Sequence, residues 1–264
     1  MRRDNSQPAA SPQNRTTRRV LSLSLAAPAF NEAAGIEAVI VEWLKYLRAD
    51  PNLQALEIVV CDDGSTDGTG AILARLAASN SELRVIHFSR NQGAAAALTA
   101  AIHETHNDWV LLIDSDGQFP IENLARMIAP IESSNARAVI GVRAKQDSAF
   151  ARFGSWSSGC LCNLFHGTRY RDFNSAFKLV DGRLLRSLRL EAKGLNYSTE
   201  ITSKLLETGT QFAEVEIVHR PRTVGKSSLK FLRGALHRLL FVTYIGLRQL
   251  MLHVGVLQRP EVVP

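Results

Sequence analysis

The chain has 264 residues, of which 45% are hydrophobic, and this is enough to bury a sizeable core in one large domain. Its net charge of +6 comes from the two ends, because residues 1–19 hold five arginines against one acid and residues 220–264 hold eight basic residues against one acid. Acidic residues outnumber basic ones in between, which excludes the evenly basic surface of a nucleic-acid-binding protein and favours contact of the basic ends with an anionic membrane.

The ends and the cysteines bear on location. Residues 1–19 are polar and contain proline, so we expect a disordered basic tail, and they lack the apolar segment of a signal peptide. No run of about 18 uncharged apolar residues occurs, so we expect no transmembrane helix. Three cysteines, an odd number without metal-ligand spacing, favour a reducing compartment. We therefore expect a cytoplasmic protein, peripheral at the cytoplasmic face of a membrane.

The first half of the chain alternates predicted strands and helices. Strands are expected over residues 20–25, 56–61, 85–88 and 109–113. Helices are expected over residues 33–47, from residue 71 onward, and from the turn of residues 91–93 to about residue 106. This alternation predicts parallel βαβ units with right-handed crossovers.

Polar or glycine-rich turns follow all four predicted strands. They are residues 28–32, 62–65, 91–93 and 114–116. Ligands of an open α/β sheet bind outside the carboxyl ends of its strands, so these turns predict a binding site at one edge.

Asp114 and Asp116 stand at positions i and i+2 after a buried strand, so their carboxylates lie on one side of the chain. Mg²⁺ or Mn²⁺ binds a few carboxylates and keeps other positions for water and substrate phosphates. The alternative is an Asp-rich turn that caps the next helix. A cation here would hold a diphosphate, which makes a nucleotide diphosphate with a metal the expected ligand.

Three residues on the neighbouring turns suit a nucleoside. Asp62 can accept hydrogen bonds from a ribose or base, Phe30 can stack on a base, and Glu32 can accept from a base amino or imide group. The dinucleotide fingerprint is absent from the first turn. Residues 224–227 form no P-loop, because Arg220 stands where the first glycine should be.

The D-D-G-S-T-D-G-T block of residues 62–69 and the D-S-D-G-Q block of residues 114–118 resemble those of family 2 glycosyltransferases of the dolichyl- or polyprenyl-phosphate sugar synthase type. Further matching segments are residues 27–32, 59–61, 90–93, 141–143, 172–178 and 220–227. The resemblance covers about residues 20–230. It implies the GT-A (nucleotide-diphosphosugar transferase) fold over residues 20–227, an α/β fold with a mainly parallel sheet flanked by helices. The residue pattern after it predicts a basic amphipathic helical extension over residues 228–264.

The resemblance also implies roles for individual residues. The nucleoside would be held by Pro28, Phe30, Glu32, Val60 and Asp62. Asp114 and Ser115 would contact the ribose and phosphate, and the metal would be held by Asp114, Asp116 and Gln118. Arg143 and Arg222 would meet the donor diphosphate or the acceptor phosphate, with Asp116 and Arg222 central to catalysis.

This sequence departs from the family pattern at two positions. Phe30 replaces the common tyrosine, which keeps stacking but loses a hydroxyl. Ser228 stands where the family has a lysine, and the charge of nearby Lys226 or Lys230 could take the place of that lysine. We assign Lys226 to the binding of the nucleotide-sugar donor.

Asp172 has two possible roles. A hydroxyl acceptor would need this carboxylate as a general base, whereas a phosphate acceptor is already an anion and needs Asp172 only to position an arginine or the substrate.

The last part of the chain combines strand and helix patterns. Residues 174–180 predict a strand across the site, and the alternation over residues 212–218 predicts an edge strand. From Arg220 to Pro260 no acid occurs, and basic and leucine positions fall on separate helical faces. Such a helix either lies in a membrane interface or packs on the protein's own core or in a homo-oligomer.

The resemblance implies inverting transfer of a sugar from a nucleotide-diphosphate donor, GDP-mannose or a UDP-hexose, to a polyprenyl phosphate. Glu32 and Asp62 suit uracil and guanine alike. Two alternatives stay open: a transferase of the same fold with a soluble or protein hydroxyl acceptor, and a non-catalytic nucleotide-sugar-binding protein.

Overall fold

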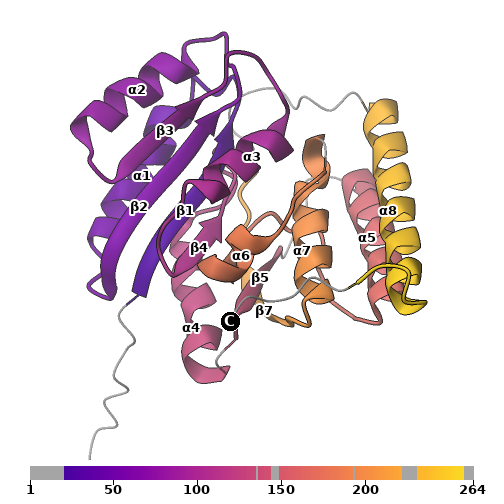
Figure 1. The fold of residues 1–264 in the computed structure, drawn as a ribbon. Coiled ribbons are helices and arrows are strands. Elements are labelled where there is room, and N and C mark those ends of the chain that lie inside the picture. The colour runs from indigo at the N-terminus through magenta and orange to yellow at the C-terminus, as the bar shows by residue number, and fades with distance from the viewer. Residues whose placement is uncertain (1–20, 135, 144–148, 193, 222–230, 259–264) are drawn as a thin grey trace, which may run out of the picture.

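The computed structural model describes residues 21–134, 136–143, 149–192, 194–221 and 231–258 (Figure 1). Seven strands form one sheet in the order β3-β2-β1-β4-β6-β5-β7. The strands are β1 (Leu21–Ala29), β2 (Leu53–Asp62), β3 (Leu83–His87), β4 (Trp109–Leu112), β5 (Ala138–Arg143), β6 (Lys178–Asp181) and β7 (Phe212–Ile217). β1 to β4 are mutually parallel, as are β5 and β7, and β6 runs antiparallel to its neighbours β4 and β5. The prediction of an α/β fold with a mainly parallel sheet is confirmed.

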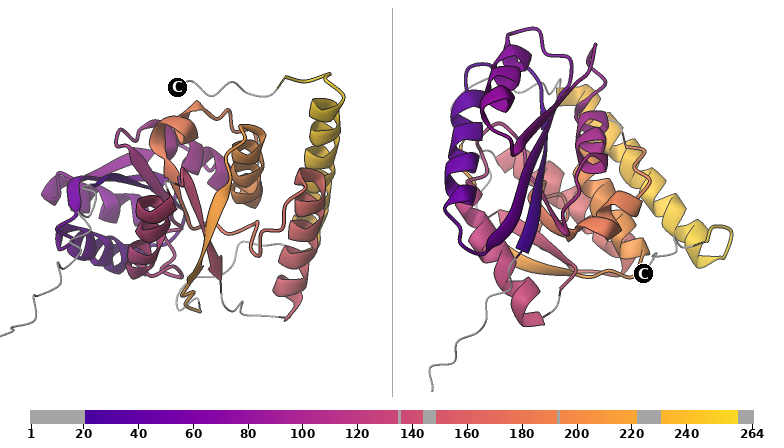
Figure 2. Two further views of the ribbon diagram at one scale, coloured as in Figure 1. Left: turned by 90° about the horizontal axis from the view of Figure 1, so that it is seen from below. Right: turned by 60° about the vertical axis from the view of Figure 1, so that its left-hand side comes forward.

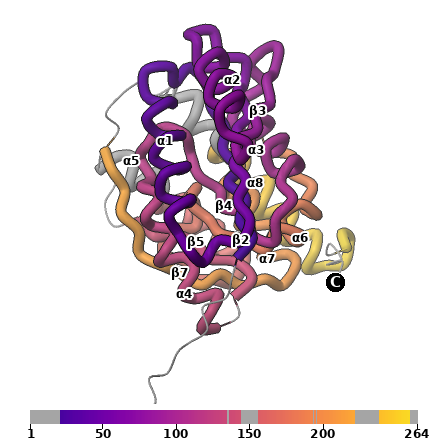
Figure 3. The backbone as a smooth tube through the Cα atoms, turned by 90° about the vertical axis from the view of Figure 1, so that its left-hand side faces the viewer, coloured from indigo at the N-terminus to yellow at the C-terminus, as the bar shows by residue number. Residues whose placement is uncertain are grey.

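Helices cover both faces of the sheet (Figure 2, Figure 3). They are α1 (Ile36–Arg48), α2 (Thr69–Ser79), α3 (Ala94–His103), α4 (Leu124–Ser134), α5 (Ala149–His166), α6 (Gly182–Ser187), α7 (Tyr197–Glu207) and α8 (Phe231–His253), with 3₁₀ turns at Ile121–Asn123 and Gly194–Asn196. Alternate residues of β1 and β4 face two cores: Leu25 and Leu111 meet α1, α2 and α4, whereas Ala26 and Leu112 meet α3, α6 and α7. Strands buried on both faces explain why their sequences are almost continuously apolar.

The first helix begins later than the sequence predicts, at Ile36 instead of residue 33. Asn31 has a φ of +53°, in the left-handed region. The backbone N–H groups of Asn31 and Ala33 donate to Ser65 Oγ (2.9 Å) and Asp67 Oδ2 (3.1 Å), respectively. These hydrogen bonds hold the end of β1 to the turn after β2, and residues 33–35 form a turn that leads into the helix.

β7 lies at the edge of the sheet, as predicted from its alternation. Ala213, Val215 and Ile217 pack on the core, while Glu216 bonds the exposed side chain of Arg171. The strand expected over residues 174–180 is shorter and begins at Lys178.

α8 packs on α5 and α7 at one side of the sheet, and the long helices α5 and α8 run side by side (Figure 2). Val242 and Ile245 form a small core with Cys162 of α5 and Phe173. α8 therefore packs on the protein's own body through one face, which is one of the two arrangements that its sequence left open.

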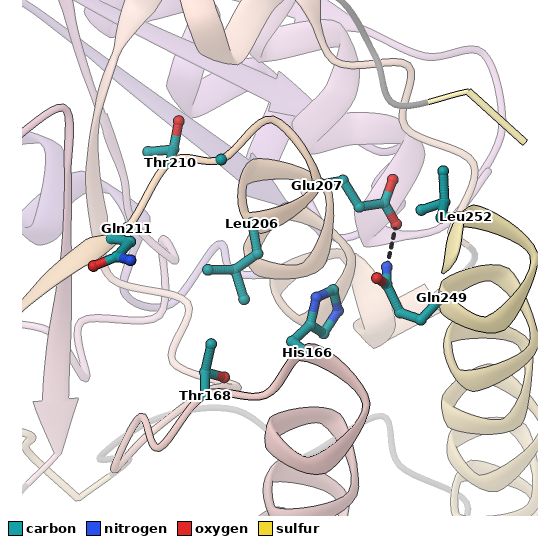
Figure 4. A pocket seen from close by; sticks show the side chains of 9 residues that line it. His166, Thr168, Leu206, Glu207, Thr210, Gln211, Gln249 and Leu252 are labelled. Carbon is teal, nitrogen blue, oxygen red and sulfur yellow. Dashed lines mark hydrogen bonds between the residues drawn. The ribbon is translucent and has the colours of Figure 1, made fainter. Parts of the chain in front are cut away.

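A buried carboxylate fastens α8 to α7. The side chain of Glu207 at the end of α7 is inaccessible, and it accepts three hydrogen bonds from Arg248 (2.9, 3.0 and 3.1 Å) and one from Gln249 (2.7 Å). Figure 4 shows Gln249 of α8 directed at Glu207, beside a small polar pocket that His166 also lines. Burial lowers the pKa of His166 to about 4, so its ring is neutral at pH 7 and adds no charge beside Glu207.

We expect Glu207→Gln to lower the free energy of unfolding by about 2–3 kcal/mol, because it leaves the Arg248 guanidinium without its carboxylate partner. Urea unfolding measures this loss. Glu37→Gln is the matched control, because the Glu37–Arg75 pair is exposed, and its urea midpoint should stay unchanged. Equal shifts in the two variants would contradict the assignment of Glu207 as the fastening of α8.

Candidate functional site

The four polar turns lie at one edge of the sheet, because β1 to β4 are parallel and each turn follows a carboxyl end. β1 pairs with β2 on one side and with β4 on the other, so the strand order reverses between β1 and β4. Open α/β sheets bind ligands at such a switch point. The predicted convergence of the turns is present, and the Asp114–Gln118 turn stands at the switch.

Ser115 and Pro28 join the two strands at this point. Ser115 is buried (4% exposed), and its hydroxyl donates a hydrogen bond to the Pro28 carbonyl oxygen (2.7 Å). This hydrogen bond fixes the turn after β4 against the end of β1, and the ligand contacts expected of the two residues stay predictions.

Asp114 follows the end of β4 and accepts a hydrogen bond from the Tyr197 hydroxyl on α7 (2.5 Å). Burial and, to a lesser extent, the neighbouring charge of Asp116 raise the pKa of Asp114 to about 6, although the Tyr197 hydrogen bond and the charge of Arg143 oppose the rise. No sequence pattern indicated Tyr197, because it is 83 residues from Asp114 and lies in a helix that was not predicted.

Asp116 and Gln118 share a tight turn around Gly117, whose φ is +75°. The Gln118 backbone N–H donates to Asp116 Oδ1 (3.0 Å), and the Gln118 side-chain nitrogen donates to the carbonyl oxygen of Arg220 (3.4 Å). The chain at Arg220 therefore runs beside the Asp114–Gln118 turn. The predicted site residues Arg222 and Lys226, and Ser228 after them, lie outside the described residues.

The donor atoms of this turn suit a hard divalent cation. Asp114, Asp116 and Gln118 offer carboxylate and amide oxygens, the ligand type that Mg²⁺ and Mn²⁺ prefer. A cation beside Asp114 would also offset the repulsion from Asp116 that raises its pKa. Within the described ranges, no group of three or more His, Cys, Asp or Glu side chains forms a closed metal centre. A cation here would therefore need further ligands from water or substrate phosphates.

The nucleoside side of the site comes from β1 and β2. Phe30 is 38% exposed at the end of β1, and Glu32 follows it beside the turn after β2. Asp62 is nearly buried, accepting from the Ser65 N–H (3.1 Å) and lying 3.2 Å from His87 Nδ1. The side chain of Val60 is fully buried in the core, so only its backbone can meet a ligand.

Asp63, next to Asp62, organises the third turn and was not among the predicted site residues. Its buried carboxylate accepts hydrogen bonds from Asn91 Nδ2 (2.9 Å) and from the backbone N–H groups of Gln92 (2.7 Å) and Gly93 (2.9 Å). One side chain therefore ties the turn after β2 to the turn after β3.

Arg143 and Asp172 form a two-pronged ion pair at the end of β5. Arg143 Nε and Nη2 donate to the two Asp172 carboxylate oxygens at 2.7 and 2.8 Å. The Arg143 backbone N–H also donates to Asp172 Oδ2, at 3.2 Å. The two side chains are 17% and 9% exposed. Buried Lys178 lies nearby, and burial lowers its pKa to about 7. Both Asp172 oxygens are engaged by Arg143, an arrangement that favours positioning over proton abstraction.

Comparison with known proteins agrees with this geometry. The family described as Glycosyl transferase family 2 matches residues 24–187. The chain is 26% identical over 216 residues to glycosyltransferase AglD of Haloferax volcanii, covering 79% of this chain and 35% of that protein. It is 24% identical over 211 residues to dodecaprenyl-phosphate galacturonate synthase of Rhizobium johnstonii, covering 78% of this chain and 61% of that protein. The chain thus spans less than two thirds of each of these relatives.

A solved structure shows the same fold. It is glucosyl-3-phosphoglycerate synthase of Mycobacterium tuberculosis in complex with Mn²⁺, UDP and glucosyl-3-phosphoglycerate, with a TM-score of 0.62 and 21% identity. The match covers 89% of this chain and 80% of that one. The predicted GT-A fold is confirmed.

Proposed function

Because this chain belongs to glycosyl transferase family 2, we propose that it transfers a sugar from a nucleotide-diphosphate donor to a polyprenyl phosphate. The observation that carries the donor half is the convergence of four polar turns at the switch point, with Asp114 and Asp116 on the turn after β4. The acceptor half is supported by the resemblance of the sequence and by the relative named as a dodecaprenyl-phosphate galacturonate synthase.

The donor's nucleoside would lie against the ends of β1 and β2. Exposed Phe30 would stack on the base, while Asp62 and Glu32 would accept hydrogen bonds from the ribose and base. Asp62 is held in place by the Ser65 N–H, which keeps its carboxylate directed at the edge of the sheet. GDP-mannose and a UDP-hexose both fit this set of acceptors.

Asp114, Asp116 and Gln118 would hold Mg²⁺ or Mn²⁺, and the solved relative with Mn²⁺ and UDP supports this choice of ion. When bound, the cation would neutralise the charge that develops on the leaving diphosphate. Tyr197 would hold Asp114 in one orientation through its 2.5 Å hydrogen bond. We also assign Arg222 and Lys226, which lie outside the described residues, to the donor diphosphate.

Arg143 would bind the acceptor's phosphate, with its guanidinium oriented by Asp172. A phosphate oxygen would then attack the anomeric carbon from the face opposite the leaving group, forming a C–O bond as the bond to the nucleoside diphosphate breaks. The acceptor is an anion at neutral pH, so this inversion needs no general base. The engagement of both Asp172 oxygens by Arg143 supports that mechanism.

The proposed acceptor is a membrane lipid, so we propose that the protein works peripherally at the cytoplasmic face of a membrane. The structural finding is narrower: none of the helices in the described ranges has the length and apolar character needed to cross a bilayer.

Product analysis tests the function. The full chain is incubated with Mn²⁺, radiolabelled GDP-mannose or UDP-hexoses, and undecaprenyl phosphate in detergent, and the product is extracted into butanol. We expect a labelled lipid in butanol with at least one donor. A water-soluble glycoside would instead indicate a hydroxyl acceptor, and a donor that raises the melting temperature without turnover on any lipid phosphate would indicate a non-catalytic binding protein.

A further inference from the structure

The carboxylate of Asp62, which we assign to the nucleoside, lies beside a histidine of the next strand. Asp62 at the end of β2 pairs directly with His87 at the end of β3, and the Phe88 N–H donates to the Asp62 carbonyl oxygen (2.9 Å). Directly paired residues of neighbouring strands project their side chains to the same face of a sheet. The strand register therefore brings the His87 ring to the Asp62 carboxylate, at the edge where the four polar turns converge.

The two side chains form a hydrogen-bonded pair. His87 Nδ1 lies 3.2 Å from Asp62 Oδ2. An ionised carboxylate only accepts hydrogen bonds, so Nδ1 carries the hydrogen of this pair and donates it. The side chain of Asp62 is 7% exposed, whereas that of His87 is 45% exposed. An exposed ring therefore holds one oxygen of a nearly buried carboxylate.

Two backbone contacts act on the same carboxylate. The Ser65 N–H donates to the other oxygen, Oδ1 (3.1 Å). Gly70, near the start of α2, packs so closely that a Cβ atom at this position would lie 2.6 Å from Asp62 Oδ2. Rotation of the carboxylate about its Cβ–Cγ bond would break both hydrogen bonds, so these contacts fix its orientation.

A fixed orientation matters more for ligand binding than for stability. The His87–Asp62 pair has one exposed member, and such pairs add little to the free energy of unfolding. A hydrogen bond to a ligand, in contrast, weakens steeply when donor and acceptor are misaligned. A carboxylate that is already ordered also loses less conformational entropy when the ligand binds. The contact of His87 is thus suited to directing Asp62 toward a ligand.

We propose that His87 is a positioning residue of the donor site: its Nδ1–H holds the Asp62 carboxylate in the orientation that accepts a hydrogen bond from the donor's nucleoside. The inference rests on the proposed function, because it takes the ligand of Asp62 to be a nucleoside diphosphate. β1 separates β2 from β4 in the sheet. His87 therefore acts at the nucleoside and not at the diphosphate or its cation.

Nucleotide binding tests this role. Titration calorimetry of the full chain measures the Kd values of UDP and GDP in the presence of Mn²⁺. His87→Leu should bind the tighter of the two nucleotides about fivefold more weakly, which is the effect of one lost hydrogen bond. His87→Asn should bind it as tightly as the unmodified chain. Asparagine Nδ2, like histidine Nδ1, is attached to Cγ and can donate to the same oxygen.

Gly70→Ala moves the same carboxylate without changing His87. The new Cβ would displace Asp62 Oδ2, so nucleotide binding should again weaken about fivefold. Alanine favours a helix over glycine, so the fold should be retained. His106→Leu is the matched control and should bind nucleotides normally. His106 Nδ1 also lies beside a carboxylate oxygen, that of Glu57 (3.4 Å), but it precedes β4 at the opposite edge of the sheet.

The transfer assay gives a second readout. His87→Leu should raise the KM for the nucleotide sugar without changing kcat, and the gain in nucleotide affinity from Mn²⁺ should stay the same. An unchanged Kd in His87→Leu, or an equal loss in His87→Asn, would overturn the positioning role; thermal unfolding checks that each variant is folded. Failure of the proposed function is distinguishable, because nucleotide binding would then depend on His87 while no polyprenyl phosphate accepts sugar. Absence of both UDP and GDP binding would overturn both proposals.

Discussion

Replacing Asp116 by alanine is expected to lower the transfer rate by about 10³-fold or more, because it removes a charged oxygen ligand at the switch point where the leaving diphosphate would be stabilised. The fold should remain intact, since Asp116 lies on a turn outside the two cores, where it accepts a hydrogen bond from the N–H of Gln118, two residues away. The rate is measured with saturating donor and Mn²⁺, and the melting temperature is measured on the same preparation.

Asp108→Ala is the matched control for Asp116. Asp108 precedes the same strand, β4, at the opposite edge of the sheet, where it accepts an exposed hydrogen bond from Ser22 (2.9 Å). We expect this variant to retain transfer. A second readout separates metal binding from catalysis: Mn²⁺ should increase the donor-induced rise in melting temperature for the unmodified chain and for Asp108→Ala, but not for Asp116→Ala. Near-normal turnover by Asp116→Ala would contradict the mechanism.

The sequence predicted the half of the fold that carries the donor site, for a physical reason. β1, β4 and the second half of β2 are largely apolar because they are buried on both faces, and each of the four strands β1 to β4 is followed by a polar turn. Parallel strands bring their carboxyl ends to one edge, so the position of the site followed once the strands were recognised. The contacts that the site residues make with other residues could not be predicted from the sequence. Val60 faces the core, and the Ser115 hydroxyl bonds the Pro28 carbonyl, because the pleat and the strand pairing decide these directions.

α7 was missed because most of its buried residues are polar. Hydrophobic periodicity is the main sequence signal for a helix, and it fails where polar side chains satisfy each other inside the protein. Glu200 accepts hydrogen bonds from the backbone N–H groups of Glu191 and Ala192 and pairs with Lys204 (3.2 Å). These partners come from other elements or become neighbours only after the helix has formed. Tyr197, at the start of this helix, is therefore the site residue that the sequence pattern could not reveal.

The Arg143–Asp172 pair offers a test of whether Asp172 positions or abstracts a proton. Asp172→Ala is expected to lower the free energy of unfolding by about 3–5 kcal/mol, because it leaves the largely buried Arg143 guanidinium without its partner. Glu216→Ala is the control: its pair with Arg171 is exposed on both sides, and its loss should be much smaller. Urea unfolding measures both.

A double variant, Arg143→Met/Asp172→Leu, separates the pair from its two members. Replacing both charges with apolar groups removes the unpaired buried guanidinium, so the double variant should be more stable than Asp172→Ala alone. If Asp172 is a positioning residue, Asp172→Asn should slow transfer mainly by raising the KM for the lipid phosphate, and the pH profile of kcat should stay unchanged. The reason is that the asparagine amide oxygen can still accept a hydrogen bond from the Arg143 guanidinium. A general base predicts the opposite split: kcat would fall sharply in Asp172→Asn, the alkaline-rising limb of its pH profile would disappear, and KM would stay near normal. The two roles therefore differ in a measurable way, and a loss confined to kcat would show that an acceptor hydroxyl is deprotonated at this site.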